Sequence, residues 1–258
     1  MRGRLLPPLL TTYTMKSFQK FFSAFLIGSL ALSSCDDGNI TDEAQLTIDK
    51  GYAVRMTGTL TNMDQWNDSK YQIVIAAFAA QDSYPLLAKN VPIKEGEQDY
   101  LFEGINPECQ TIELCVLNLI NKKVASIETI FDKAEDANRS LDDTIFYHPD
   151  NVDVGMFSCI QNSIFTKTCA FCHGKGESAA ASLYLTEDKS YENLVNTSSS
   201  KIDSLKRVDP YNAEKSMLYK VLTEYSDSCG WHYNHTNFFY GNSTSNLVKE
   251  WINSGALH

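Results

Sequence analysis

Positive charge is scarce in this chain of 258 residues. Lysine and arginine together number 22 against 32 aspartates and glutamates, and the formal net charge at neutral pH is −10. The segment before residue 35 contains basic residues and no acid, so the remainder of the chain is more acidic still. A surface of this sign repels phosphate backbones, which disfavours nucleic acid as a partner.

The chain also lacks an apolar run long enough for an ordinary membrane-spanning helix. Its most apolar stretch, "FFSAFLIGSLAL", follows Lys16 and Lys20 and ends at "LSSC", directly before two aspartates. A basic segment, a short apolar segment and then small residues are the order of a secretory signal. We therefore predict that residues 1–35 are a signal peptide, with Met15 as an alternative start of translation.

The end of this segment, Leu-Ser-Ser-Cys, resembles the lipobox of bacterial lipoproteins, whose cysteine, here Cys35, is acylated and becomes the mature N-terminus. The resemblance implies export and lipid anchoring to the bacterial outer membrane, on its periplasmic or cell-surface side. A plain secretory signal with a chance cysteine is the alternative. Residues 36–47 are polar and acidic without an apolar period, and we expect them to form a tether.

Residues 48–148 show the period of β-strands. "YAVRMTGTL" alternates between two faces, "YQIVIAAFA" is apolar on both faces as a central strand would be, and "QTIELCVLNLI" and "VASIETIF" follow after turn-prone residues. Several short strands at this spacing predict a small antiparallel, immunoglobulin-like β-sandwich. We identify no catalytic constellation within it.

Residues 149–258 change to a helical period. Met156, Ile160 and Ile164 recur near helical spacing, and "EKSMLYKVLTEY" and "STSNLVKEWINSG" repeat the pattern, the latter with hydroxyl caps and a terminating glycine. The sequence therefore predicts a multidomain protein, in which an all-β domain is followed by a small, mostly α domain.

The strongest chemical signal is "TKTCAFCHGKG", in which Cys169, Cys172 and His173 form a Cys-x-x-Cys-His motif. This is the attachment signature of c-type haem: two thiols bond the porphyrin vinyl groups, and the adjacent histidine binds the iron. The motif occurs once, which predicts one covalent haem c per chain and excludes a di-haem peroxidase.

Three other readings of the motif remain open: a thioredoxin-like redox pair, a structural disulfide, and a zinc site. A zinc site would combine the two motif cysteines with two of Cys229, His232 and His235, at a spacing far longer than zinc sites usually have.

The motif and the segments after it, including "YENLVN", "RVDPYNAEKSMLYKVLTEY" and "LVKEWINSGAL", resemble the cytochrome c domain of exported planctomycete and Bacteroidetes proteins. The likeness covers residues 155–257. It implies a small helical haem domain, and the preceding β-rich region resembles the companion domain of Bacteroidetes lipoproteins. Members of this family usually supply the sixth iron ligand from a Met-Pro pair late in the domain.

This chain departs from the family because no methionine lies between Tyr225 and Asn246. Met217, the sole methionine after the motif, falls on an apolar helical stripe and is expected in the core. His232 and His235 are the candidate distal ligands, with His235 preferred. An open or water-bound sixth position is the alternative. Replacing a thioether by an imidazole predicts a lower reduction potential.

Four cysteines lie outside the motif and the lipobox. We predict a disulfide between Cys159 and Cys229, because it would join the entry helix to the loop that carries the candidate distal ligand. A pair between Cys109 and Cys115 is excluded if their segment is a strand, since extended residues at that separation are too far apart. Cys115, within an apolar stretch, is expected to be a buried thiol.

These observations predict a membrane-anchored mono-haem electron carrier, not an enzyme, whose unidentified redox partner presents a basic face to this acidic chain. The first alternative is a surface binding module for a glycan or protein, with haem as a sensor or structural element. The second is a peroxidase-like haem enzyme, which requires an open iron position.

Overall fold

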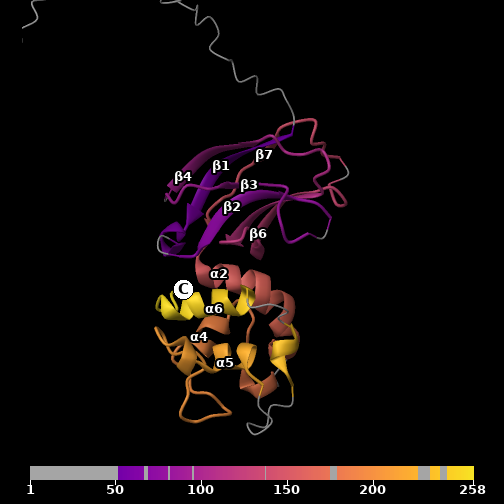
Figure 1. Cartoon of the computed structure of the whole chain (residues 1–258). Coiled ribbons are helices and arrows are strands. Elements are labelled where there is room, and N and C mark those ends of the chain that lie inside the picture. The colour runs from indigo at the N-terminus through magenta and orange to yellow at the C-terminus, as the bar shows by residue number, and fades with distance from the viewer. Residues whose placement is uncertain are drawn as a thin grey trace, which may run out of the picture. The chain divides into compact units, whose positions relative to one another are not determined.

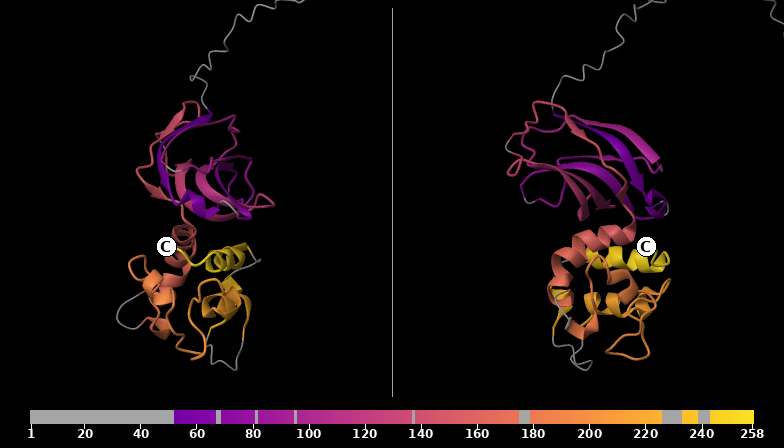
Figure 2. Two further views of the ribbon diagram at one scale, coloured as in Figure 1. Left: turned by 90° about the vertical axis from the view of Figure 1, so that its left-hand side faces the viewer. Right: turned by 180° about the vertical axis from the view of Figure 1, so that it is seen from behind.

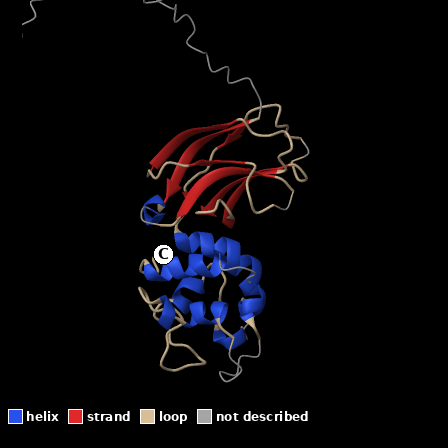
Figure 3. Ribbon diagram, viewed as in Figure 1, coloured by secondary structure: helices blue, strands red, loops and turns tan. Residues whose placement is uncertain are grey.

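A computed structural model provides the fold. It describes residues 52–66, 69–80, 82–94, 96–136, 138–174, 179–225, 233–238 and 243–258. Within the unit formed by Ile48–His258, the strands come first in the chain and most of the helices follow (Figures 1 and 3). The predicted order of a β-rich part and then a helical part is confirmed.

The strands form two sheets, which are visible as two layers in Figure 2. In the described residues the strands are β1 (Ala53–Thr61), β2 (Tyr71–Phe78), β3 (Leu87–Asn90), β4 (Gly96–Glu103), β5 (Thr111–Asn118), β6 (Lys123–Asp132), β7 (Ile145–Tyr147) and β8 (Val152–Asp153). The first sheet has the order β4-β1-β7, with β8 also paired to β1, and the second has the order β3-β2-β5-β6.

The two sheets share one hydrophobic core. Alternate residues of β1, including Val54 and Met56, and alternate residues of β5, including Leu114 and Val116, belong to the same buried cluster. Strands β2 and β5 are buried on both faces, which the continuous apolar sequence of β2 predicts. A smaller buried cluster, which includes Cys115, occupies their other face.

The expectation of a purely antiparallel arrangement was wrong. Strands β7 and β8 both pair with β1 in parallel, with Val54 opposite Ile145 and Leu60 opposite Val152. After β6 the chain crosses from the second sheet to the first, where β7 runs in the same direction as β1. Strand β8 extends the sheet a few residues beyond the predicted boundary at residue 148.

The helical part begins with one continuous helix of three segments. Helix α2 (Met156–Ile160) leads into a π-helix, η2 (Gln161–Cys169), and then into α3 (Ala170–His173). The other helical elements are α4 (Ser190–Leu194), α5 (Met217–Thr223), α6 (Ser243–Asn253) and the 3-10 turns η1 (Met63–Trp66), η3 (Ala180–Ser182), η4 (Ala213–Lys215) and η6 (His235–Phe238). None of the helices in these described ranges has the length and apolar content to cross a bilayer.

Phe157 is the centre of an aromatic cluster that joins the first helix to the last. Its ring lies 5.1 Å from Tyr191 and 5.2 Å from Trp251, measured between centroids. The Tyr191 hydroxyl and the Trp251 indole N–H donate to backbone carbonyls near the chain's last residue. The stripe of apolar residues predicted on α6 is therefore buried by the helix that carries the cysteine motif.

Hydrogen bonds also join the β-rich part to this helix and to the residues just before it. The Trp66 indole N–H donates to the Val154 carbonyl at 2.7 Å. Farther along, the Ser163 hydroxyl of η2 donates to the Ser126 carbonyl of β6 at 2.7 Å and accepts the Ser126 N–H at 3.0 Å. Ser163 thus satisfies both backbone groups of one residue of β6.

Replacing Ser163 by alanine should destabilise the protein. It removes the partner of a backbone donor and of a backbone acceptor, and leaving such groups unsatisfied costs about 1–3 kcal/mol in the free energy of unfolding. Chemical denaturation followed by circular dichroism measures the change. Asn162→Ala, an exposed neighbour on the same helix, is the control and should change stability by less than about 0.5 kcal/mol. Equal effects of the two substitutions would contradict this role of Ser163.

Candidate functional site

The cysteine motif lies at the end of the long helix. Cys169 is the last residue of η2, and Cys172 and His173 lie in α3, one turn further on. π-Helical geometry is rare and occurs most often near functional sites. Because the three motif residues span one helical turn at the end of this helix, the two sulfur atoms and the imidazole lie at one helix terminus. The sequence predicts this arrangement.

A buried glutamine holds the preceding turns of this helix. Gln161 donates to the Leu185 carbonyl and to the Thr166 hydroxyl, both at 3.1 Å, and it accepts from the Ser190 hydroxyl at 2.6 Å. Leu185 in turn donates its backbone N–H to the His173 carbonyl at 2.6 Å. The segment after the motif is thereby tied to the start of the π-helix and to the end of α3.

Gly174 allows the chain to turn directly after His173. A Cβ atom at this position would lie 2.6 Å from the Ala170 carbonyl oxygen, closer than real Cβ contacts. The motif thus ends in a glycine because the backbone passes against its own helix there.

The His173 ring is oriented by its hydrogen bond to the backbone. Its Nδ1 lies 2.9 Å from the Ala180 carbonyl oxygen. A carbonyl can only accept, so Nδ1 carries the proton of the neutral ring and Nε2 keeps its lone pair. A histidine that ligates a metal commonly makes such a bond with its other ring nitrogen.

His235 of η6 faces His173. The two ring centroids are 6.2 Å apart and the ring planes are inclined by 27°. Bonds from a metal to imidazole nitrogen are about 2.0–2.1 Å, so two imidazoles on opposite sides of one metal have centroids roughly 6 Å apart. The observed separation is therefore of the size that two imidazoles sharing a metal would have, while the rings themselves are stacked.

The surroundings favour the uncharged form of both rings. Burial, opposed by carbonyls of Ala180 and Leu183, lowers the pKa of His173 below the usual value. Burial and then the nearby His173 lower the pKa of His235. Nδ1 of His235 is buried and has no hydrogen-bond partner among the described residues. Neutral imidazoles are the form that binds iron, and an unpaired buried nitrogen is costly unless something else occupies it.

The two motif cysteines are free thiols, Cys169 half-buried and Cys172 exposed. Burial, with a smaller contribution from Cys172, raises the pKa of Cys169 to about 12. A thioredoxin-like redox pair needs a thiolate of lowered pKa, so this environment argues against that alternative. The groups that gather here (two thiols and two neutral imidazoles) fit a covalently attached haem.

The zinc alternative receives no ligand cluster from the described residues. Within those ranges, no three side chains of His, Cys, Asp or Glu come close enough to hold a metal ion. Cys229 and His232, two of the ligands that this alternative would use, lie outside the described residues.

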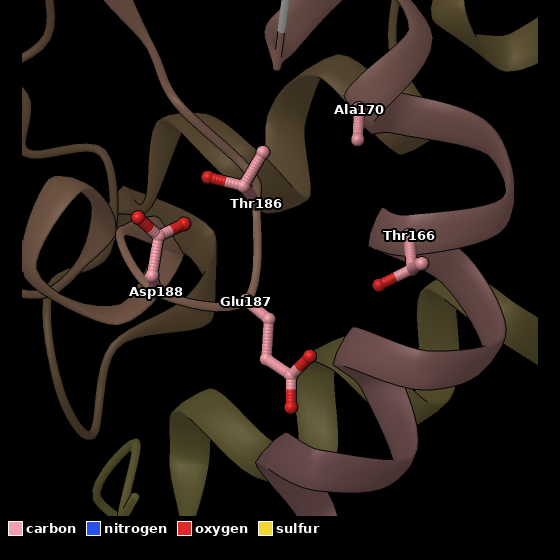
Figure 4. A pocket seen from close by; sticks show the side chains of 5 residues that line it. All are labelled: Thr166, Ala170, Thr186, Glu187 and Asp188. Atoms are coloured by element: carbon pink, nitrogen blue, oxygen red, sulfur yellow. The ribbon is translucent and has the colours of Figure 1, made fainter.

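A hollow of about 480 Å³ lies on another flank of the motif helix (Figure 4). It is lined by Thr166 and Ala170 from that helix and by Thr186, Glu187 and Asp188 from the segment across it. Neither histidine and neither motif cysteine lines this hollow, so we do not assign the haem to it.

Several other predicted residues have defined positions. Met217 is buried on α5, which confirms that it belongs to the core. Cys115 and Cys159 are both buried. Cys35 and the predicted disulfide partner Cys229 lie outside the described residues, so lipidation and the Cys159–Cys229 pair stay predictions.

Sequence reasoning missed two supports of the site. The Ala180 carbonyl could not be found, because a backbone acceptor has no sequence signature. Gln161 did leave a signal, because it is a polar residue next to Ile160 and three residues before Ile164, both of them apolar. The structure buries it almost completely. A buried side chain of this kind needs specific hydrogen-bond partners.

Comparison with known proteins adds no relative: no family model, curated protein or solved structure matches this chain.

The lowered pKa values predict a direction for the pH dependence of stability. As the pH falls, the unfolded chain binds protons at these histidines near pH 6.5, before the folded chain does. The free energy of unfolding should therefore fall as the pH is lowered through about 6.5 toward the folded pKa values, and these residues should contribute no slope well above it. Urea denaturation between about pH 7.5 and 5.5 tests this.

The double variant His173→Gln/His235→Gln is the comparison for that measurement. Because it lacks both titrating groups, its stability should depend less steeply on pH in this window. The same slope in the variant and in the unchanged protein would show that other groups set the dependence.

Proposed function

We propose that this protein is a mono-haem c-type cytochrome that transfers electrons and catalyses no reaction of its own. Cys169 and Cys172 would hold the haem through thioether bonds, and His173 would bind the iron from one side. His235 would bind the iron from the other side. The observation that carries the proposal is the pair of facing, neutral imidazoles, one of which belongs to the haem-attachment motif.

Bound haem would supply an iron that gains or loses one electron. The residues around it would set how the iron is held and at what potential it changes charge. The carbonyl of Ala180 holds the Nδ1 proton of His173, so Nε2 is the nitrogen that would bind the iron. Burial keeps both imidazoles uncharged, and a histidine in place of methionine favours a lower potential.

We further propose that Cys35 is lipidated and that the chain is exported and anchored to the outer membrane, with an immunoglobulin-like β-sandwich as the platform for the haem domain. Export accords with the motif, because haem is attached covalently outside the cytoplasm. The strongly acidic composition supports a redox partner with a basic face, which would be steered to this protein at low salt.

Production of the full chain in cells with a c-type haem maturation system tests haem attachment. Haem should remain bound to the denatured chain, at one per protein, because the thioether bonds survive unfolding. The double variant Cys169→Ser/Cys172→Ser should lose covalent haem entirely. Cys109→Ala, which changes a buried cysteine of the β-rich part, should retain it. The proposal fails if the unchanged protein carries no covalent haem, and a zinc analysis of the same sample tests the main rival.

Carbon monoxide tests the second axial ligand. Reduced protein should bind it poorly, because two strong ligands occupy the iron, whereas His235→Ala should bind it readily and show the spectrum of an open site. His232→Ala is the matched control and should behave like the unchanged protein. The opposite result for the two variants would move the ligand to His232. Ready binding by the unchanged protein would favour the peroxidase-like alternative.

A further inference from the structure

The segment that follows the motif holds an unusual backbone conformation. Ala181 and Ser182, both within η3, have φ values of 56° and 50°, the left-handed region that residues with a side chain rarely adopt. Such a conformation persists only where surrounding contacts impose it. These two residues come directly after Ala180, whose carbonyl accepts the His173 Nδ1 proton.

Arg207 makes two of the hydrogen bonds that hold this conformation. Its guanidinium donates to the carbonyls of Ala181 at 3.2 Å and Ser182 at 3.1 Å. The first two bonds come from one terminal nitrogen of the guanidinium, Nη2. The other terminal nitrogen, Nη1, donates to the Asn193 carbonyl at 3.0 Å. His173 thus bonds the first of three successive carbonyls, which also accepts the Leu183 N–H at 3.2 Å, and Arg207 bonds the next two. The Ser200 hydroxyl donates to the Ala181 carbonyl as well, at 3.3 Å.

The backbone of Arg207 is itself held firmly. Its N–H donates to the Thr197 carbonyl at 2.7 Å, and its carbonyl accepts the Leu218 N–H at 2.9 Å, at the start of α5. The side chain is half-buried. Arginine suits this role because its planar fork can hold several carbonyls at once, which the single ammonium of lysine cannot do in the same geometry.

We propose that Arg207 is the positioning residue of the axial ligand His173: by holding the left-handed turn at Ala181 and Ser182, it keeps the Ala180 carbonyl on Nδ1 and thereby sets the donor strength of Nε2 toward iron. This inference rests on the proposed haem function. A hydrogen bond on Nδ1 makes an imidazole a stronger ligand, so loss of the clamp weakens the bond between His173 and iron.

The test uses the haem-loaded full chain. Arg207→Lys keeps the positive charge and loses the fork, and Arg207→Gln loses both. The adjacent Lys206→Gln is the matched control, because Lys206 bonds Asn196 and Asp209 and does not contact the turn. Two readouts report on the ligand itself: the midpoint potential, and the iron–histidine stretching band in resonance Raman spectra, recorded in the His235→Ala background to open the sixth position.

In both Arg207 variants the iron–histidine band should shift to lower frequency, while Lys206→Gln leaves it in place. Arg207→Lys should also raise the midpoint potential, because a weaker donor stabilises oxidised iron less. We expect a several-fold change in the equilibrium constant of reduction, where tenfold corresponds to about 59 mV. Covalent haem content should stay at one per chain in every variant, since the thioether bonds do not involve this loop.

Each failure has a distinct meaning. If Arg207→Lys and Arg207→Gln both retain haem and leave the band and the potential unchanged, the positioning role is wrong and the haem assignment stands. If neither variant accumulates as a folded haem protein while Lys206→Gln does, Arg207 has a structural role only and the inference is likewise overturned. Absence of haem from the unchanged protein would refute the proposed function instead.

Discussion

The hydrogen bond between His173 Nδ1 and the Ala180 carbonyl is the constraint to which the surrounding structure conforms. It requires the helix to end at His173, so that the chain can return to the ring within seven residues, and Gly174 makes that turn possible. It also requires the carbonyl to stay in place, although the two residues after it adopt left-handed backbone angles. Nδ1 is thereby committed to a backbone carbonyl, as one ring nitrogen of a metal-ligating histidine commonly is.

The β-rich part stabilises the helix that bears this constraint. Strand β6, which helices α2, η2 and α6 all contact, departs from regular pairing at three points along β5. Such bulges bend a strand and change its twist. Behind β6, the largely buried carboxylate of Glu113 accepts from Lys123 at 2.6 Å and from the Ser126 hydroxyl at 2.7 Å, so its charge is paired and hydrogen-bonded, as burial demands. The same Ser126 meets Ser163 through its backbone. A shared core and these bonds make the sheets a rigid support for the motif helix.

The sequence was sufficient to predict those strands and helices that a local pattern of apolar residues marks. Period-two alternation located β1, a continuous apolar run located β2, and helical spacing located the helix before the cysteines, because each pattern reflects which side chains one element buries. The parallel pairing of β7 and β8 with β1 could not be predicted from the sequence. Strands of three and two residues are too short to show a period, and their direction depends on where the preceding chain crosses between the sheets. At the site, the motif named Cys169, Cys172 and His173, and the missing methionine left His232 and His235 as candidate ligands, of which His235 was preferred and lies beside His173. The backbone acceptor at Ala180 has no sequence signature, because any residue type supplies a carbonyl.

The environment of the two imidazoles bears on how a haem between them would behave. Both rings have lowered pKa values, chiefly through burial, so protons compete weakly with a metal for their lone pairs near neutral pH. The motif also remains open to solvent on one side: Cys172 is exposed, and the Phe171 side chain between the cysteines is 72% exposed. Electron transfer needs a buried, stable ligand field and a route by which a partner can come close. In the proposed cytochrome, two half-buried imidazoles behind the exposed Cys172 and Phe171 would provide both, whereas a peroxidase would need the side at His235 to admit a substrate.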